Sequence, residues 1–420
     1  MAEITAPRGT YDILPGESRR WQYVEDMVRE IFHNYGYEEF RTPVFEHTEL
    51  FVRGIGDATD VVQKEMYTFT DRGGRSLTLR PEGTASVVRA YLEHKLQGAS
   101  QPVKVYYSFP MFRYERPQAG RYRQFVQFGA ECIGTADPIA DVEMIAAPVE
   151  LYQRLGLRKF RVEINSIGCP QCRPRYREVL VEWLKQRSEV LCQTCQERME
   201  QNPLRVLDCK EASCQEATAE APLVTDYLCD ECETHFAKVQ DYLRSLEIPF
   251  VINKRLVRGL DYYTKTVFEI ISEGVGAQSS IAGGGRYDGL VEDVGGQPTP
   301  AVGFAAGMDR LWLALESEKV EIPVSLDFDV YVACLGDSAR GKAVDLAFAL
   351  RNEGCRVDLD YQGRSLKAQL KSANRSGAKV TVILGEDELQ RGVASVRNME
   401  SGEQQEVPLT ELLSFCKSVL

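Results

Sequence analysis

The sequence predicts an α+β protein with several domains, built on antiparallel strands and ending in a smaller α/β domain. Two segments, 104–131 and 257–290, each contain two strand-like runs joined by a loop, which predicts antiparallel pairs. Between them, residues 168–252 lose strand-like alternation and are rich in cysteine. After residue 328, short apolar runs alternate with helical patterns, which is typical of an α/β domain.

Composition and charge limit the classes of function. The chain has 420 residues, 44% of them hydrophobic, and a net charge of −12, which indicate a globular protein with a large core. No apolar run approaches the roughly 18 residues of a membrane span, and the first residues lack the apolar core of a signal peptide. We therefore expect a cytoplasmic protein that uses no membrane. Its charge disfavours a non-specific coat on nucleic acid but permits local basic grooves.

The N-terminal segments predict a helix and then an extended run. After Pro15, apolar residues at helical spacing predict an amphipathic helix that ends near Gly36. These apolar residues are Trp21, Val24, Met27, Ile31 and Phe32. FRTPVFEHTELFVR at 40–53 predicts an extended run, in which Pro43 favours an edge, a bulge or an interface over a central strand.

Residues 76–94 predict a strand, a turn over 80–84 and a helix. Thr84 is the predicted cap of that helix. Glu82 lies just ahead of it, where the helix dipole favours a carboxylate, and this is the plainest role for Glu82.

The segment 104–131 predicts a hairpin that presents charge. In its second strand, side chains alternate between a core face with Val126, Phe128 and Ala130 and an opposite face with Gln127, Gly129 and Glu131. Arg113 closes the first strand, and the loop carries Arg116, Arg121 and Arg123. The alternative is an ordinary antiparallel pair with one solvated face.

The segment 257–290 favours a binding site over a plain sheet. Its polar and aromatic residues lie beside the glycine triplet 283–285, and glycine lets a backbone approach a ligand closely. These residues are Arg258, Tyr262, Tyr263, Arg286 and Tyr287.

Residues 303–315 predict a helix with small residues at its start and one apolar face, made by Met308, Leu311, Trp312 and Leu315. Arg310 projects from its beginning, and a solvated salt bridge is the plain alternative for it. Residues 316–328 predict a linker.

The last segment, 328–420, contains three short strand-like runs, DVYVACLG, CRVDLDY and KVTVILG. It carries 12 basic and 13 acidic residues, so it is nearly neutral. Arg364, Lys367, Lys371 and Arg375 fall at helical spacing and predict one basic stripe. Such a stripe suits an RNA backbone or is a solvated helix face.

Eight of the 12 cysteines lie within residues 169–232. They form three C-x-x-C pairs and one wider pair, a spacing that zinc ligands use: Cys169/Cys172, Cys192/Cys195, Cys209/Cys214 and Cys229/Cys232. One or two structural Zn²⁺ ions are one interpretation, and small buried cysteines that pack as apolar residues are the other. Disulfides are not expected in the cytosol. We interpret Cys132, Cys334, Cys355 and Cys416 as core residues.

Two other patterns point to weaker sites. GDSARGKA at 336–343 nearly matches a phosphate-binding loop, but Ala343 supplies no hydroxyl for magnesium. The four histidines, His33, His47, His94 and His235, show no ligand-like pairing. We interpret them as surface or satisfied core residues.

Five segments, in order, resemble the motifs of the histidyl-tRNA synthetases, a family of class II aminoacyl-tRNA synthetases. FRTPVFEHTELFVRGIG, FRYERPQAGRYRQFVQFGAE and GFAAGMDRL resemble class II motifs 1, 2 and 3, and LVRGLDYYTKTVFE and AGGGRYDGL resemble the two histidine signatures. The resemblance implies a homodimer with a catalytic domain over 1–325 on a six-stranded antiparallel sheet. It further implies an insertion domain at 168–252 and an anticodon-binding domain at 328–420.

The resemblance also implies residue roles for a ligase that uses ATP with Mg²⁺, histidine and histidine tRNA. Arg258 and Arg113 would be catalytic, and ATP would be bound by Arg113, Glu115, Arg121 and Arg310. Histidine would be bound by Glu82, Gly83, Thr84, Arg113, Gln127, Glu131, Arg258, Tyr262, Tyr263 and Tyr287. Arg121 and Arg123 would contact the nucleotide or the tRNA acceptor end.

A non-catalytic paralogue is the alternative, namely a regulatory subunit that supports ATP phosphoribosyltransferase. Such paralogues typically lose the arginine signatures and the C-terminal domain. Here Arg113, Arg258, Arg310 and residues 328–420 are all present, which favours the enzyme.

Overall fold

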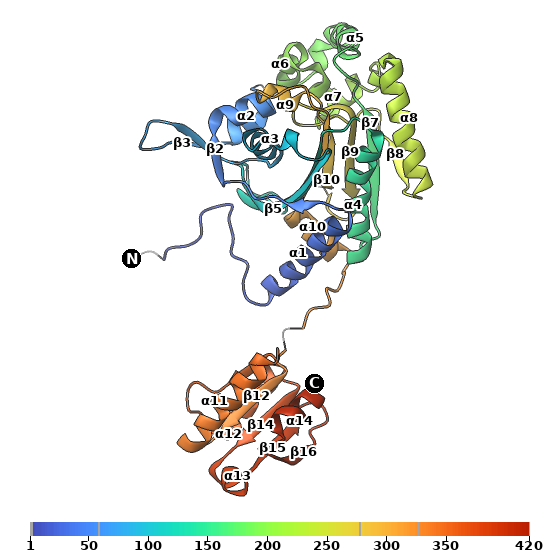
Figure 1. Ribbon diagram of the computed structural model, residues 1–420. Helices are drawn as coiled ribbons and strands as arrows, with labels where there is room; N and C mark the ends of the chain where they lie inside the picture. The colour runs from blue at the N-terminus through green and yellow to red at the C-terminus, as the bar shows by residue number, and fades with distance from the viewer. Residues whose placement is uncertain (1–2, 58, 277–278, 326, 420) are drawn as a thin grey trace. The chain divides into compact units, whose positions relative to one another are not determined.

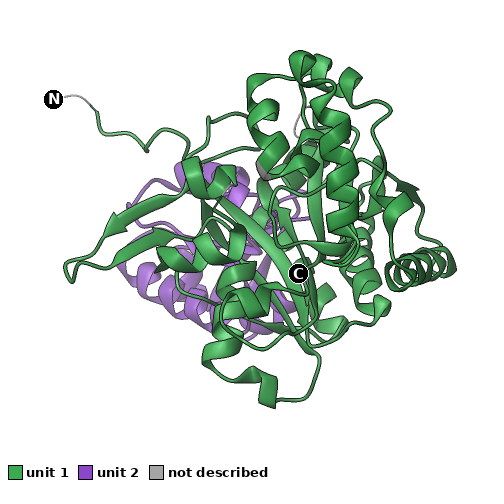
Figure 2. Cartoon of the chain, turned by 90° about the horizontal axis from the view of Figure 1, so that it is seen from above, with its two compact units in different colours: residues 1–14, 21–322 green, residues 15–20, 323–420 purple. Residues whose placement is uncertain are grey.

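The computed structural model describes residues 3–57, 59–276, 279–325 and 327–419. The chain divides into two compact units, residues 1–14 with 21–322 and residues 15–20 with 323–420 (Figure 2). Each unit packs its own hydrophobic core, since the buried clusters of the first lie within 21–322 and those of the second within 328–416.

The first unit is built on one large sheet (Figure 1). Across this sheet the strands are β1 (Glu38–Glu39), β5 (Val103–Phe112), β6 (Gln124–Ile133), β11 (Ala301–Gly307), β10 (Ser280–Arg286), β9 (Thr264–Ser272), β7 (Phe160–Ser166) and β8 (Phe250–Ile252). The six inner strands pair antiparallel, while β1 and β8 add short parallel strands at the two edges. The expected six-stranded antiparallel sheet is thus the centre of a mixed eight-stranded one.

Helices close one face of this sheet. Alternation along the strands puts Tyr106 into the larger apolar cluster and Tyr107 into the cluster on the opposite face. The larger cluster packs under α1 (Glu17–Asn34), α4 (Pro138–Leu155), α8 (Asp230–Ser245) and α10 (Met308–Ser317). Against the cluster on the opposite face pack the shorter helices α3 (Thr84–Glu93) and α9 (Leu290–Asp293), with Leu96 and Leu204 from short helical turns, and this face has room for a pocket.

Two predictions for the first unit are wrong in part. The segment 40–53 is extended only as far as β2 (Phe45–His47), because Leu50, Phe51 and Ile55 recur at helical spacing and bury one face of α2 (Thr48–Ile55). β2 instead pairs in a small sheet with β4 (Ser76–Leu79) and β3 (Tyr67–Thr70). The predicted helix over 303–315 begins only at α10, because residues 301–307 are the central strand β11.

The cysteine-rich segment is mainly helical and has a core of its own. Its helices are α5 (Arg173–Lys185), α6 (Gln193–Gln201) and α7 (Ala212–Ala217), followed by α8. It ends in β8, so the predicted loss of strand structure through residue 252 is wrong for the last three residues. Short helical turns complete the unit: η1 (Val61–Glu65), η2 (Leu96–Gly98), η3 (Ser188–Val190), η4 (Pro203–Val206) and η5 (Val224–Tyr227).

The second unit has the predicted α/β pattern and an antiparallel extension that was not predicted. Its sheet order is β13 (Val357–Leu359), β12 (Val330–Cys334), β14 (Val380–Leu384), β15 (Val393–Asn398) and β16 (Gln404–Pro408). The first three strands are parallel, and the last two form a hairpin. α11 (Asp337–Asn352) and α14 (Leu412–Ser418) pack in one apolar cluster, and α12 (Leu366–Arg375) packs in the other. α13 (Glu386–Arg391) precedes the hairpin.

The predicted basic stripe is shorter than expected. Lys367, Lys371 and Arg375 lie exposed on α12. Arg364 precedes the helix, and its Nε donates a hydrogen bond to Oδ1 of the buried Asp360 at 2.5 Å. Its charge is therefore paired within the unit.

Candidate active site

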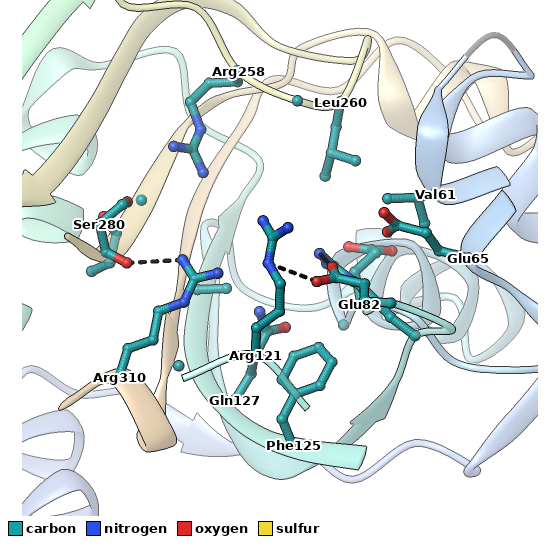
Figure 3. Close-up of a pocket in the computed structure, with 18 of the residues that line it drawn as sticks. Val61, Glu65, Glu82, Arg121, Phe125, Gln127, Arg258, Leu260, Ser280 and Arg310 are labelled. Atoms are coloured by element: carbon teal, nitrogen blue, oxygen red, sulfur yellow. Dashed lines mark hydrogen bonds and ion pairs between the residues drawn. The ribbon is translucent and has the colours of Figure 1, made fainter. Parts of the chain in front are cut away.

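A cavity of about 390 Å³ opens over β6, β11 and β10 on the face of the sheet that carries few helices. Its walls also include the start of α3, the loop between β5 and β6 and the loop that follows β8. Figure 3 shows charged side chains from these elements pointing into one space. The residues are far apart in the chain, so the antiparallel sheet is what assembles them.

Three arginines gather at one end of the cavity. Nε of Arg310, in the first turn of α10, donates to the Gly120 carbonyl at 3.2 Å, and its Nη1 donates to the Ser280 carbonyl at 3.0 Å. Nε of Arg121 lies 2.7 Å from Oε2 of Glu115. Burial and the nearby charges of Arg121 and Arg113 lower the pKa of Arg310. This end therefore favours a ligand with several negative charges.

Arg258 enters from the opposite wall, as Figure 3 shows. It is ion-paired with Glu269 of β9. Burial disfavours the charged guanidinium, but the Glu269 carboxylate and the neighbouring Tyr263 and Tyr262 together outweigh burial and raise the pKa of Arg258. A Cβ built at Gly283 would lie 2.5 Å from Nη1 of Arg258, so the glycine is what lets the guanidinium lie flat on β10.

Two buried carboxylates organise the other end. Glu82 accepts hydrogen bonds from the backbone N–H groups of Thr84 and Ala85, both at 2.8 Å, so the carboxylate itself caps α3. The prediction that Thr84 is the cap is wrong, because its hydroxyl is used elsewhere: Thr84 Oγ1 donates to Oε1 of Glu131 at 2.7 Å. The helix start and the sheet are thereby joined by one short bond.

Glu131 is fully buried beneath the cavity. Its Oε2 accepts from the Tyr287 hydroxyl at 2.5 Å, and its Oε1 also accepts from the Tyr107 hydroxyl at 3.3 Å. A Cβ at Gly303 would lie 1.6 Å from Oε2, so only glycine fits beside this carboxylate. The alternative of a hairpin with one solvated face is therefore wrong, because on this face Gln127 lines a polar pocket and Glu131 is buried beneath it.

Further polar groups at this end are available to a ligand. Gln127 Oε1 is buried and, of the residues that the structure describes, none donates a hydrogen bond to it. The rings of Tyr262 and Tyr263 lie 4.6 Å apart, and that of Tyr287 lies 5.6 Å from Tyr262. An occupant that donates to Gln127 and packs against the tyrosines would satisfy both features.

Comparison with known proteins places this pocket in a family. The family described as "Histidyl-tRNA synthetase" matches residues 9–311, and the family described as "Anticodon binding domain" matches residues 329–419. The histidine–tRNA ligase of Desulforamulus reducens is 55% identical over 414 residues, 99% of each chain. That of Geobacillus kaustophilus is 57% identical over 412 residues, 97% of each chain.

A solved structure agrees with these sequences. The crystal structure of the apo S. aureus histidyl-tRNA synthetase is 41% identical, covers 99% of this chain and 100% of that one, and superposes with a TM-score of 0.86. The chain belongs to the histidyl-tRNA synthetase family. This confirms the resemblance, the class II fold and the prediction of an ATP-dependent histidine–tRNA ligase over the regulatory paralogue.

The pocket of this chain brings together most of the residues that the resemblance names for ATP and histidine. Its lining includes Glu82, Gly83, Thr84, Arg113, Glu115, Arg121, Gln127, Arg258, Tyr262, Tyr263 and Arg310. Glu131 and Tyr287 lie behind the lining and reach it through the Thr84 hydroxyl. Arg286 does not face the site, because it is fully buried and paired with Asp141.

Several pocket residues were not predicted from the sequence. The cavity lining includes Asp60, Glu65, Arg205 and Asp309, and Tyr107 lies behind the lining, where its hydroxyl donates to Glu131. Tyr107 pairs across strands with Gly129, and an aromatic residue opposite a glycine was a signal that could have found it. Arg205 and Asp60 come from segments whose sequence carries no such mark.

The two weaker patterns have structural roles. Ala339 and Ala343 of the GDSARGKA segment are buried in the core of the second unit. His235 is buried, with Nε2 3.3 Å from Oδ1 of Asp141, whereas His33, His47 and His94 are exposed.

The buried Glu131 gives the fold a specific pH dependence. Burial raises the pKa of Glu131 from 4.5 to about 8, against the opposing effect of its hydroxyl donors. Between these values the unfolded chain carries the charge and the folded chain holds the proton, so stability falls as pH rises through this window. Relative to Glu131→Gln, the wild type should lose on the order of 1 kcal/mol per pH unit there. Urea unfolding of both proteins at several pH values measures this, and parallel curves would contradict it.

Proposed function

We propose that this pocket activates histidine by letting its carboxylate attack the α-phosphate of ATP. A carboxylate oxygen bonds to the α-phosphorus as the bond to the leaving pyrophosphate breaks, which yields histidyl-adenylate. A terminal ribose hydroxyl of histidine tRNA then takes the histidyl group and releases AMP. The observation that supports this most is the cavity itself, with arginines at one end and the Glu131 network at the other.

The arginine end suits ATP. Arg113, Arg121 and Arg310 present planar guanidinium groups that donate in pairs to phosphate oxygens. Glu115 holds Arg121 in place, with Oε2 2.7 Å from the Arg121 Nε. Mg²⁺ enters with ATP as part of the substrate, where it neutralises phosphate charge.

The other end suits histidine. The Glu131 carboxylate and Gln127 Oε1 accept hydrogen bonds, and the tyrosines enclose a flat ring. An apolar side chain of the same size would leave the buried Gln127 Oε1 unpaired, so the pocket rejects it strongly. Glu82, at the start of α3, lies where the amino group of the substrate would be paired.

The reaction needs no nucleophile from the protein, because the substrate carboxylate attacks directly. Catalysis then comes from alignment of the two substrates and from stabilisation of negative charge at the α-phosphate. Arg258 and Arg113 are our proposed catalytic residues, because both line the cavity and they come from different walls, the loop after β8 and the loop between β5 and β6.

Histidine-dependent exchange of labelled pyrophosphate into ATP tests the activation step without tRNA. We expect exchange only when histidine is present, and no exchange with leucine or phenylalanine. Absence of exchange by folded protein with both substrates present would overturn the proposed function.

We further propose that the catalytic domain spans 1–325 with the insertion domain at 168–252, and that residues 328–420 bind the tRNA anticodon. The family match to residues 329–419 supports the last assignment. In the first unit, Arg123 packs over the Tyr114 ring at 4.0 Å, and with Arg121 it is the candidate contact for the nucleotide or the acceptor end. We also propose a cytoplasmic location. Within the described ranges, every helix falls short of the length or apolar character that crossing a bilayer requires.

The segment around Pro43 is our proposed dimer interface. Phe45 and Phe69 pack edge to face on the small sheet, yet remain 51% and 43% exposed, which is costly for a monomer in water. Replacing both with glutamate should give a monomer in light scattering and remove most activity, because an obligate interface also stabilises the fold. The matched control is Tyr242→Glu on α8, which should stay dimeric. A fully active wild-type monomer at assay concentration would contradict the proposal.

The eight clustered cysteines are our proposed ligands for structural Zn²⁺. They come together in two groups of four, Cys169, Cys172, Cys229 and Cys232, and Cys192, Cys195, Cys209 and Cys214. Neutral core cysteines need no such grouping, so this arrangement supports the metal over the apolar interpretation.

A further inference from the structure

The sulfur atoms of each group have the spacing of a tetrathiolate metal site. Cys169 Sγ lies 3.6 Å from Cys172 Sγ and 3.9 Å from Cys229 Sγ. Cys192 Sγ lies 3.9 Å from Cys209 Sγ. A tetrahedral zinc site with Zn–S bonds of about 2.3 Å has sulfurs about 3.8 Å apart, whereas a disulfide needs about 2.05 Å.

The two groups are built alike. In the first, the backbone N–H of Cys229 donates to Cys172 Sγ at 3.1 Å, and in the second that of Cys192 donates to Cys214 Sγ at 3.2 Å. In both, a C-x-x-C turn places the fourth residue over the first, since Cys172 N donates to Cys169 O and Cys195 N to Cys192 O. Hydrogen bonds from backbone N–H groups stabilise a thiolate, which is the form that binds metal.

The first group joins the two ends of the helical segment next to the histidine pocket. Arg173, which follows Cys172, donates to the Tyr263 carbonyl. Glu231, which precedes Cys232, bonds to Lys265 Nζ at 2.7 Å, and Lys265 N donates to the Gly168 carbonyl at 2.9 Å. The first group is therefore tied to the start of β9, the strand that follows Tyr263.

The second group frames a wall of the pocket. Between Cys195 and Cys209 the chain forms the end of α6, Asn202 and η4, and three side chains of this stretch contact the pocket wall or the loop 258–261. Arg198 Nη2 lies 2.6 Å from Asp60 Oδ2, and Asn202 Nδ2 donates to Asp261 Oδ1 at 2.6 Å. Arg205 lines the cavity, and its Nη1 lies 3.5 Å from the Arg258 carbonyl.

We infer that the two groups are separate zinc sites, and that the second one positions the loop 258–261 for histidine activation. The inference rests on the proposed function, because it assigns Arg258 to that reaction. The ion at Cys192, Cys195, Cys209 and Cys214 fixes the segment 195–209. That segment then holds Asp261 and the Arg258 carbonyl through Asn202 and Arg205. These two residues are positioning residues, not catalytic ones.

Metal analysis of full-length protein, purified without chelator, tests the first half of the inference. The wild type should contain two zinc ions per chain. We expect one zinc ion per chain in each of the double variants Cys195→Ser/Cys209→Ser and Cys172→Ser/Cys232→Ser. The control is Cys132→Ser, at a buried cysteine outside both groups, and it should keep two zinc ions. Fewer than two ions in the wild type, or loss of both ions from one double variant, would overturn the assignment of two separate sites.

Kinetics of the Asn202→Ala/Arg205→Ala variant test the second half. This variant keeps every thiol, so it should retain two zinc ions and still lose about tenfold or more in kcat for pyrophosphate exchange, because a misplaced Arg258 misaligns the reaction. Cys195→Ser/Cys209→Ser should lose a similar factor and become more sensitive to protease within 195–209. Normal kcat in the zinc-loaded Asn202→Ala/Arg205→Ala variant would overturn the positioning role. Failure of the wild type to exchange pyrophosphate would instead count against the proposed function, and the zinc content would stand apart from it.

Discussion

Arg258→Ala is expected to slow histidyl-adenylate formation on the order of 100-fold, or about 2.7 kcal/mol of activation free energy. The reason is the position of this guanidinium, which faces Arg121 and Arg310 from the opposite wall of the cavity. Its charge is secured by Glu269, which raises its pKa. Histidine-dependent pyrophosphate exchange measures the adenylation step. The affinity for histidine should change little, because Glu131 and Gln127 are unchanged.

Two variants separate chemistry from folding in this experiment. Arg258→Lys keeps the charge but not the planar fork, so it should restore activity only in part. Removing Arg258 leaves Glu269 without its partner, and the double variant Arg258→Ala/Glu269→Gln removes that extra cost while keeping the catalytic loss. Arg244→Ala, at an exposed arginine on α8, is the matched control and should be unaffected. Exchange at the wild-type rate by Arg258→Ala would exclude the catalytic role.

Deletion of residues 328–420 should leave adenylate formation within a few-fold of the wild type and reduce kcat/KM for tRNA on the order of 100-fold or more. The apolar clusters of the first unit lie within residues 21–322, so the pocket keeps its core when the second unit is removed. Pyrophosphate exchange and tRNA charging, measured on the same preparation, test this. Equal losses in both would show that the second unit supports the pocket.

Charge reversal on α12 narrows the effect to one surface. Lys371→Glu, alone or with Lys367→Glu and Arg375→Glu, should raise KM for tRNA and flatten its salt dependence by about one unit of slope per lost phosphate contact. Lys342→Glu is the matched control, because α11 packs on the opposite side of the sheet from α12. Identical tRNA kinetics for Lys371→Glu and Lys342→Glu would identify α12 as a solvated face.

The strands of the first unit were largely predictable because their side chains alternate, and α1 because its apolar residues repeat at helical spacing. The errors fall where a short segment fits both the two-residue alternation of a strand and the spacing of a helix. At 48–55 the adjacent apolar residues Phe51 and Val52 concealed the helical spacing of Leu50, Phe51 and Ile55, which packs α2 against α3. At 301–307 small residues next to a helical pattern concealed a strand that the sheet needs at its centre.

The candidate site was predictable where the resemblance names residues, and much less so from chemistry alone. Glu82 lies at the start of α3 as expected, but Thr84 is not the cap, because its hydroxyl bonds to Glu131, a residue 47 positions away that meets it only in the folded sheet. Arg205 is of the same kind, since its place in the pocket follows from how the cysteine-rich segment folds back over residues 258–261. Long-range pairing of this kind leaves no local mark in the sequence.

Arg113, Arg121 and Arg310 stand close enough that burial and mutual repulsion together lower the pKa of Arg310. Any polyphosphate that enters relieves this repulsion, and the pyrophosphate released by the reaction does so as well as ATP. On the proposed assignment, the groups that draw ATP in also retain the leaving product, and the reverse reaction runs whenever pyrophosphate accumulates. Net formation of charged tRNA then depends on removal of pyrophosphate from the surrounding solution by a process outside this protein.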